Sequence, residues 1–113
     1  MVFLNNGCIV CKTSSLHGDI SIGSGTIVHP FATIEARNGT IVIGDNNIIE
    51  ENVEIINDGA DDSIMIIGNG NTFQVGSKIH CRKMGNNNLI ESGCVLSRDV
   101  VLSFGCVITA GIS

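Results

Sequence analysis

Residues 16–34 read LHGDISIGSGTIVHPFATI, and a large aliphatic residue recurs in this stretch at every sixth position. These residues are Leu16, Ile22, Val28 and Ile34. A spacing of six is neither the helical period of about 3.6 nor the alternation of a plain strand. It fits a short strand, a bend and another short strand, each strand turning one large side chain inward. Three such units would close one triangular coil of about 18 residues.

The period of six continues through the chain with three changes of register. The register slips after Ile34, after Ile55 and after Ile79, and an apolar residue stands at every step. The predicted inward positions are Leu4, Val10, Leu16, Ile22, Val28, Ile34, Ile43, Ile49, Ile55, Ile67, Phe73, Ile79, Met84, Ile90, Leu96, Leu102 and Ile108. Four places after many of them stands a small or aliphatic residue that a bend would tuck in: Cys8, Ser14, Ile20, Thr26, Ala32, Val53, Ser77, Cys94, Val100, Cys106 and Ile112. The pattern predicts an all-β solenoid of about six coils over residues 1–113, with an incomplete last coil.

Composition supports one small domain with an aliphatic core. The chain has 113 residues, 43% of them hydrophobic and 15% charged, with four Phe and neither Tyr nor Trp. The formal net charge of −5 disfavours nucleic-acid binding. No apolar run reaches the roughly 18–20 residues that span a bilayer, and the first residues lack a secretory signal pattern.

The cysteines favour free thiols in a reducing cytoplasm. Five cysteines make an odd set, whereas a secreted disulfide scaffold usually has an even one. Cys8 and Cys11 form a lone Cys-x-x-C without a second pair of zinc ligands at suitable spacing. We therefore expect neither a zinc site nor another cofactor here.

Two columns of stacked residues are predicted from a longer repeat. Residues 43–50, 67–74 and 84–91 share the pattern of an aliphatic residue, Gly, and then Asn at the fifth place. The glycines at this corner, expected to permit unusual backbone dihedrals, are Gly23, Gly44, Gly68 and Gly85. The second column holds Asn47, Asn71 and Asn88, which we expect to form an inward amide ladder.

The hexapeptide pattern resembles the left-handed parallel β-helix family, which includes acyltransferases and γ-class carbonic anhydrases. The left hand comes from this resemblance. An acyltransferase of this kind needs a catalytic histidine. The candidates His17, His29 and His80 stand on different coils, and no local acid in the sequence is assigned to orient any of them.

Comparison with the carbonic anhydrases predicts an incomplete metal site. Residues 17–19 look like the Arg-Gly-Asp element of those enzymes, with His in place of Arg. By the same resemblance, the three zinc histidines would fall on Glu35, Val75 and His80. A catalytic zinc needs three protein ligands and an open position, so one histidine cannot build the site.

The three register slips predict an edge of the prism where loops gather. Each slip follows the third strand of a coil, and insertions in solenoids often cluster on the binding face. The longest insertion is residues 56–63, which is polar and acidic. Position and charge select these partner-contact candidates: Arg37, Asn38, Asp58, Asp61 and Asp62 at the slips, and a basic group of Lys78, Arg82 and Lys83.

Several segments together resemble a β-helix subunit of the dynactin pointed-end complex. They are residues 16–23, residues 28–30 with Ala32, and residues 41–51, 65–68 and 83–92. The family continues past residue 113 with further β-helix and a C-terminal helix, and its acidic loop after Ile55 is longer.

This resemblance implies a non-enzymatic scaffold of the cytoplasm and cytoskeleton. By this resemblance, the chain would pair with dynactin subunit 5, which is a second β-helix. It would lie beside the subunit-4 protein and an actin-related protein. Through them it would support binding of dynein and cargo adaptors and microtubule-based transport. The alternative is a hexapeptide enzyme of the carbonic-anhydrase or acyltransferase type.

Overall fold

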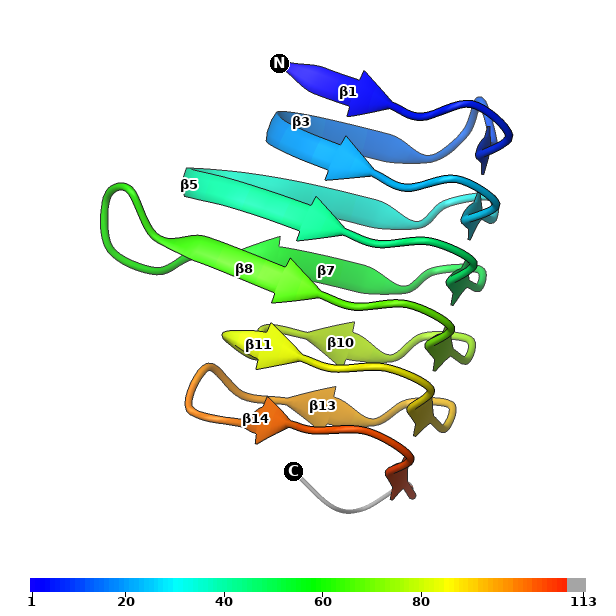
Figure 1. Cartoon of the computed structure of the whole chain (residues 1–113), viewed down its shortest axis with the longest axis vertical. Helices are drawn as coiled ribbons and strands as arrows, with labels where there is room; N and C mark the ends of the chain where they lie inside the picture. The colour runs from blue at the N-terminus through cyan, green and yellow to red at the C-terminus, as the bar shows by residue number, and fades with distance from the viewer. Residues whose placement is uncertain (110–113) are drawn as a thin grey trace.

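Residues 1–109, which the computed structural model describes, wind into a left-handed, three-sided parallel β-helix. With the N-terminus at the top of Figure 1, the near strands run to the right and the far strands return to the left as the chain descends, which is a left-handed winding. About five turns are formed, close to the expected six coils, so the predicted fold class is confirmed. Ile112, which the pattern placed inward, lies outside the described residues.

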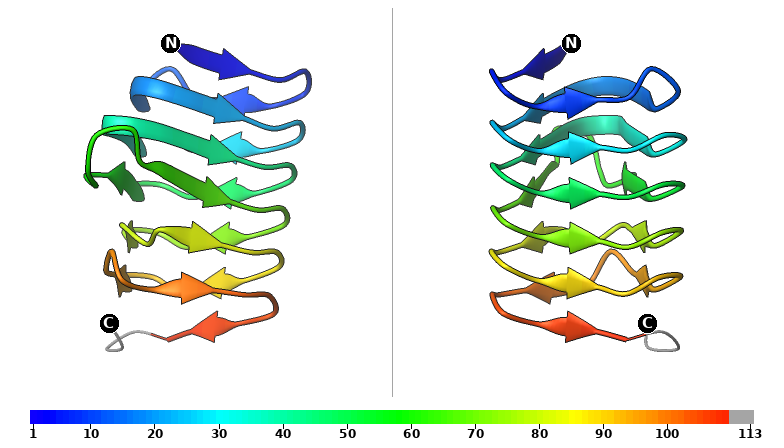
Figure 2. Two further views of the ribbon diagram at one scale, coloured as in Figure 1. Left: turned by 60° about the vertical axis from the view of Figure 1, so that its left-hand side comes forward. Right: turned by 90° about the vertical axis from the view of Figure 1, so that its right-hand side faces the viewer.

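Each coil contributes a strand to three faces, and Figure 2 shows them from two further sides. The first face contains β1 (Val2–Leu4), the second half of β3 (Ser15–Ile22), the second half of β5 (Thr33–Ile43), β8 (Ile64–Ile67), β11 (Lys83–Met84) and β14 (Val101–Leu102). The second face is the sheet of β2 (Ile9–Val10), β4 (Ile27–Val28), β6 (Ile48–Ile49), β9 (Thr72–Phe73), β12 (Leu89–Ile90) and β15 (Val107–Ile108). The third face contains the first halves of β3 and β5 with β7 (Glu54–Asn57), β10 (Lys78–Ile79) and β13 (Val95–Leu96).

The strands of each face are parallel and in register from coil to coil. On the second face, for example, Ile27 pairs with Ile9 of the coil before it and with Ile48 of the coil after it. Each strand pairs only with the strands of adjacent coils, so the backbone hydrogen bonds of the sheets lie along the prism axis. Residues 1–109 form no helix that is long and apolar enough to cross a membrane.

The core is the stack of aliphatic side chains that the period of six predicts. In the middle coils these side chains are fully buried, and at the two ends they are half-buried against the same cluster. The exception is Leu4, which is 45% exposed because no coil covers it from above. Fully burying one such side chain contributes about 1.5–3 kcal/mol, so the stacked core supplies most of the driving force for folding.

The glycine column exists, but its physical reason differs from the expected one. Gly23, Gly44, Gly68 and Gly85 do not have left-handed backbone angles. Glycine is needed there because adjacent coils approach closely: a Cβ at Gly44 would lie 2.7 Å from the carbonyl oxygen of Gly68. The left-handed residues of this corner stand two places later, for example Asn46 and Gly70 with φ of 57° and 69°. Glycine is therefore required by space rather than by dihedral angle.

The predicted amide ladder is confirmed. The backbone N–H of Asn71 donates to Oδ1 of Asn47 at 2.8 Å, and the backbone N–H of Asn88 donates to Oδ1 of Asn71 at 2.9 Å. Each side-chain Nδ2 in turn donates to the carbonyl oxygen of a glycine or serine at the corner of the next coil. Buried polar groups are costly unless paired, and this arrangement pairs them from coil to coil.

Candidate functional site

The insertion edge is the corner between the third and first faces, made by residues 17–19, 36–40, 57–63, 80–82 and 97–100. In the second and third coils the chain passes this corner as continuous strands, with a register shift between His17 and Asp19. In the next coil it leaves the prism as residues 58–63, the green loop that projects at the left of Figure 1. The expectation that the register slips share one edge is therefore confirmed.

Asn57 shapes the projecting loop from beneath. Its buried Nδ2 donates to the carbonyl oxygen of Thr40 at 3.0 Å, and its Oδ1 accepts the backbone N–H of Gly59 at 3.1 Å and the hydroxyl of Ser63 at 3.2 Å. Asn38 reaches from the coil above and donates to the carbonyl oxygen of Gly59 at 3.2 Å. Hydrogen bonds thus join both ends of the loop to the prism and hold the loop in a defined conformation.

Asp58 and His80 lie beside each other below the loop. Asp58 Oδ2 lies 3.5 Å from His80 Nδ1, and both side chains are partly exposed. From the sequence, no acid was assigned to any of the three histidines. For His80 this was wrong, because Asp58 lies beside it. The two residues lie in successive coils at the same edge, a proximity that the slips in register conceal. The contact brings the loop beside the coil beneath it.

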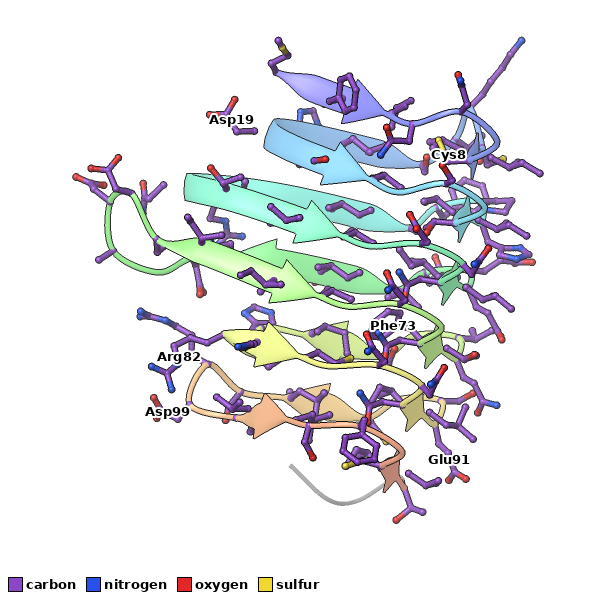
Figure 3. All side chains as sticks on the ribbon, in the orientation of Figure 1. Cys8, Asp19, Phe73, Arg82, Glu91 and Asp99 are labelled. Carbon is purple, nitrogen blue, oxygen red and sulfur yellow. The ribbon has the colours of Figure 1, made fainter. Side chains whose placement is uncertain are left out.

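The other contact candidates divide between the edge and its two neighbouring faces. Figure 3 shows Arg82 on the insertion edge, where Asp19 and Asp99 also lie, whereas Glu91 lies on the opposite side. Arg37, Asn38, Asp61 and Asp62 are exposed on this edge, and Arg37 Nε donates to Glu35 Oε1 at 3.1 Å. The predicted basic group is split. Lys78 lies on the third face, where it stands in strand register with Glu54 of the adjacent coil. Lys83 lies on the first face, in strand register with Ile66.

A shallow pocket of about 430 Å³ opens beside the loop. Its lining is mainly backbone and polar side chains from three coils: Gly18, Asp19, Ala36, Arg37, Asn38, Gly39, Thr40, Asp62 and Ile64. Asp19 also accepts the N-terminal ammonium of Met1 at 2.6 Å. Charges of both signs line this hollow, which suits the rim of a protein contact.

The residues compared with zinc ligands are not gathered at one point. Glu35 and His80 lie in the same outward row of the third face, but Ile56 stands between them. Val75 lies at another corner, beside His29. Within the part of the chain that the structure describes, no group of three His, Cys, Asp or Glu residues is placed to hold a metal ion.

Cys8 and Cys11 are both free thiols in different surroundings. Cys8 packs against the core, whereas Cys11 lies outside it with its Sγ 3.6 Å from the hydroxyl of Thr13. Hydrogen bonds from Thr13 lower the pKa of Cys11. By contrast, burial raises the pKa of Cys81 to about 11. A thiol reagent will therefore reach Cys11 long before Cys81.

A row of outward aliphatic side chains on the second face was not predicted from the sequence. Each residue stands one place before an inward one and pairs in register with its neighbours in the adjacent coils: Ile9, Ile27, Ile48, Thr72, Leu89 and Val107. Ile9 and Val107 are 61% and 58% exposed. The signal was present, because five of these six positions hold Ile, Leu or Val although strand alternation places them in solvent.

In comparisons with curated proteins, the chain is similar to dynactin subunit 6 from several organisms. It is 44% identical to the dynactin subunit 6 of Nematostella vectensis, over 92% of this chain and 61% of the relative. It is 42% identical to the dynactin subunit 6 of Xenopus tropicalis, over 92% of this chain and 56% of the relative. It is 38% identical to that of Caenorhabditis elegans, over 85% of this chain and 56% of the relative. The chain thus spans somewhat more than half the length of these relatives. No protein-family model matches it. A solved hexapeptide transferase family protein from Anaplasma phagocytophilum has a TM-score of 0.48 and 18% identity, covering 93% of this chain and 74% of that chain.

Proposed function

We propose that this chain, a sequence relative of dynactin subunit 6 along most of its length, is a structural subunit of dynactin without enzymatic activity of its own. The observation that carries the proposal is the similarity to dynactin subunit 6 from five different organisms, sustained through the coils of the prism. A rigid prism suits this role because its faces are formed before any partner arrives. Little conformational entropy is then lost when a partner docks.

At a finer level, we place the chain at the pointed end of the complex, paired with dynactin subunit 5. In this position it would contact the subunit-4 protein and an actin-related protein. It would support the engagement of dynein and cargo adaptors in the cytoplasm, in association with the cytoskeleton. These assignments extend to this chain what the family resemblance implies.

The insertion edge is proposed as one contact surface of the subunit. Asp61 and Asp62 project from a loop that Asn57 and Asn38 hold in place, and Arg82 lies nearby on the same edge. Exposed charges at a rim mainly affect association rate and partner choice. Reversing the charge at the loop tip, in Asp61→Lys, should slow assembly and weaken its dependence on salt without altering the melting temperature.

The test is affinity capture of the tagged chain from cell extract, with mass spectrometry and a zinc assay on the same eluate. We expect the recovered proteins to include dynactin subunit 5 and the actin-related protein in near-stoichiometric amounts, co-sedimenting with the chain as one large particle. An untagged chain expressed at the same level is the control. Recovery of a metal-loaded homotrimer without other dynactin subunits would contradict the proposal.

The second candidate is a hexapeptide enzyme, and the Asp58–His80 contact is the observation that favours it. A carboxylate beside an imidazole is the arrangement of an oriented general base. The same eluate should therefore be assayed for carbon dioxide hydration and acetyl transfer. Activity that His80→Gln abolishes, in a variant with unchanged melting temperature, would establish this alternative.

A further inference from the structure

We propose that the corner between the second and third faces is a docking site for an arginine side chain of a partner protein, with the ring of Phe31 as its platform. The chain passes this corner directly after each strand of the second face, at the right of the right-hand view of Figure 2. This site is separate from the insertion edge and does not depend on the complex to which the chain belongs.

Phe31 has a backbone conformation that bulky residues rarely adopt. Its φ is 63°, in the left-handed region, within a turn closed by a hydrogen bond from the backbone N–H of Ala32 to the carbonyl oxygen of His29 at 3.4 Å. Glycine or asparagine usually occupies this place of such a turn. Three coils below follow that rule at the same place in register, with φ of 61°, 74° and 75° at Asn52, Gly76 and Gly93. Phe31 is therefore the exception in its column.

The ring of Phe31 is not needed to fill the core. Phe31 is 60% exposed, whereas its neighbour Ala32 supplies the buried side chain of this corner. Strained backbone conformations that persist despite their cost cluster at functional sites. Aromatic side chains are also enriched where proteins contact one another. An exposed phenylalanine at a strained position is thus better explained by a contact than by folding.

A hollow of about 170 Å³ opens beside this turn. Two carboxylates, one imidazole and one aliphatic side chain line it: Glu50, Glu51, His29 and Val75. The backbone N–H of Asn52 donates to the carbonyl oxygen of Pro30 at 3.4 Å, so Glu51 lies in the coil directly beneath the residue that precedes Phe31. Val75 is 46% exposed and provides an apolar wall. Apolar surface, carboxylates and an aromatic ring therefore meet at one corner.

The two carboxylates have no cation of their own. Among residues 1–109, neither Glu50 nor Glu51 forms an ion pair. Lys12 is the basic residue of this column, and it lies two coils away from Glu51. Arginine matches the site because its planar guanidinium binds a carboxylate through paired hydrogen bonds and stacks on an aromatic ring. Its alkyl stem can lie against Val75.

Two other occupants match this corner less well. The ammonium of lysine is compact and strongly hydrated, so it neither stacks on a ring nor forms a paired hydrogen bond with a carboxylate. A second copy of this chain brings the same carboxylates and the same formal net charge of −5. Charge complementarity therefore favours a different protein that presents an arginine.

The experiment titrates the ¹⁵N-labelled 113-residue chain with the peptide acetyl-Gly-Arg-Gly-amide and follows backbone amide shifts by nuclear magnetic resonance. We expect saturable shifts at residues 29, 31, 50–52 and 75. The matched probe replaces arginine by citrulline, which keeps the shape and removes the charge, and it should bind at least tenfold more weakly. Equal binding of the citrulline or the lysine peptide would overturn the assignment. So would shifts confined to other residues, or a chain dimer whose interface is this corner.

One substitution separates a contact role of Phe31 from a structural one. Phe31→Asn introduces the residue type of the next coil, so it should raise the melting temperature by about 2–6 °C while weakening arginine-peptide binding at least fivefold. Phe104→Asn is the matched control, because Phe104 is 76% exposed at another corner and lacks a left-handed φ. It should change neither quantity. A lower melting temperature for Phe31→Asn, or equal losses of binding in the two variants, would refute the proposal.

A second matched pair tests the carboxylates. Glu51→Gln should weaken binding of the arginine peptide at least threefold at low salt, with the melting temperature unchanged. Glu54→Gln, on the third face, should leave the affinity unchanged within error. Equal effects of the two variants would mean that only the net charge of the chain attracts the peptide, and the proposed site would be wrong.

Discussion

Substitution of Asn71 by alanine tests whether the amide ladder holds the coils together. Asn71 is fully buried, and its side chain connects its own coil with the coils on both sides. Alanine keeps the backbone in place and removes only the amide. The backbone N–H of Asn71 still donates to Asn47, so the upper half of the ladder remains.

The expected cost follows from the groups that lose their partners. The backbone N–H of Asn88 loses its acceptor, which lay 2.9 Å away. The carbonyl oxygen of Gly85 loses the donor that lay 2.9 Å away. An unsatisfied buried polar group costs about 1–3 kcal/mol, so with two such groups Asn71→Ala should lose about 2–6 kcal/mol of unfolding free energy. Single domains have only about 5–15 kcal/mol in total, so the variant should be close to unfolding at 37 °C.

Urea unfolding followed by far-ultraviolet circular dichroism is the suitable assay, because the chain has no Trp or Tyr to report by fluorescence. The matched control is Asn69→Ala, two residues away at the same corner. Its exposed Oδ1 accepts the backbone N–H of Asp45 at 2.7 Å, and water can replace it at a cost of about 0.5–1 kcal/mol. A loss below about 1 kcal/mol for Asn71→Ala, or equal losses for the two variants, would refute the reasoning.

Three further predictions concern packing and titration. Gly68→Ala should cost several kcal/mol, because its Cβ would lie 2.6 Å from the carbonyl oxygen of Gly85; a melting curve within 3 °C of the unsubstituted protein would count against this close approach. Ile90→Asp should leave the chain unfolded by circular dichroism, since it buries an unpaired charge in the core, whereas the exposed Glu51→Lys should change the melting temperature by less than about 3 °C; the opposite order would mean that the register is wrong. Burial raises the pKa of Cys81 from 9.0 to about 11, so the stability that its neutral thiol contributes is complete below pH 9 and is lost as pH rises toward 11. Between pH 8 and pH 10.5 the unfolding free energy should therefore fall more for the unsubstituted chain than for Cys81→Ala, and an equal fall would disprove this assignment.

The repeat made the core predictable, because a solenoid repeats one local rule. Each inward residue depends only on its place within a hexapeptide, so residues from Val10 to Ile108 could be assigned without knowing any distant contact. The amide ladder followed from the same rule. The left hand required a family resemblance, since spacing alone is the same for both hands.

The surface was less predictable, because contacts between coils depend on the lengths of the insertions. Asp58 meets His80 only because the chain makes one whole turn between them. Residues 45–62 hold seven acidic residues and no basic residue. In the structure that segment passes around the second and third faces to the insertion edge, so its charges form a belt. The outward aliphatic row was not predicted, because the repeat was traced through the inward positions alone.

Because its hydrogen bonds run along the axis, the prism should resist force differently in different directions. The backbone bonds of the sheets and the amide ladder both join one coil to the next. Tension along the axis would stretch the bonds between two coils together, so they would share the load. A force that peels the last strand sideways would break them one after another at far lower load. The angle at which a load is applied to the prism therefore decides how much tension it bears.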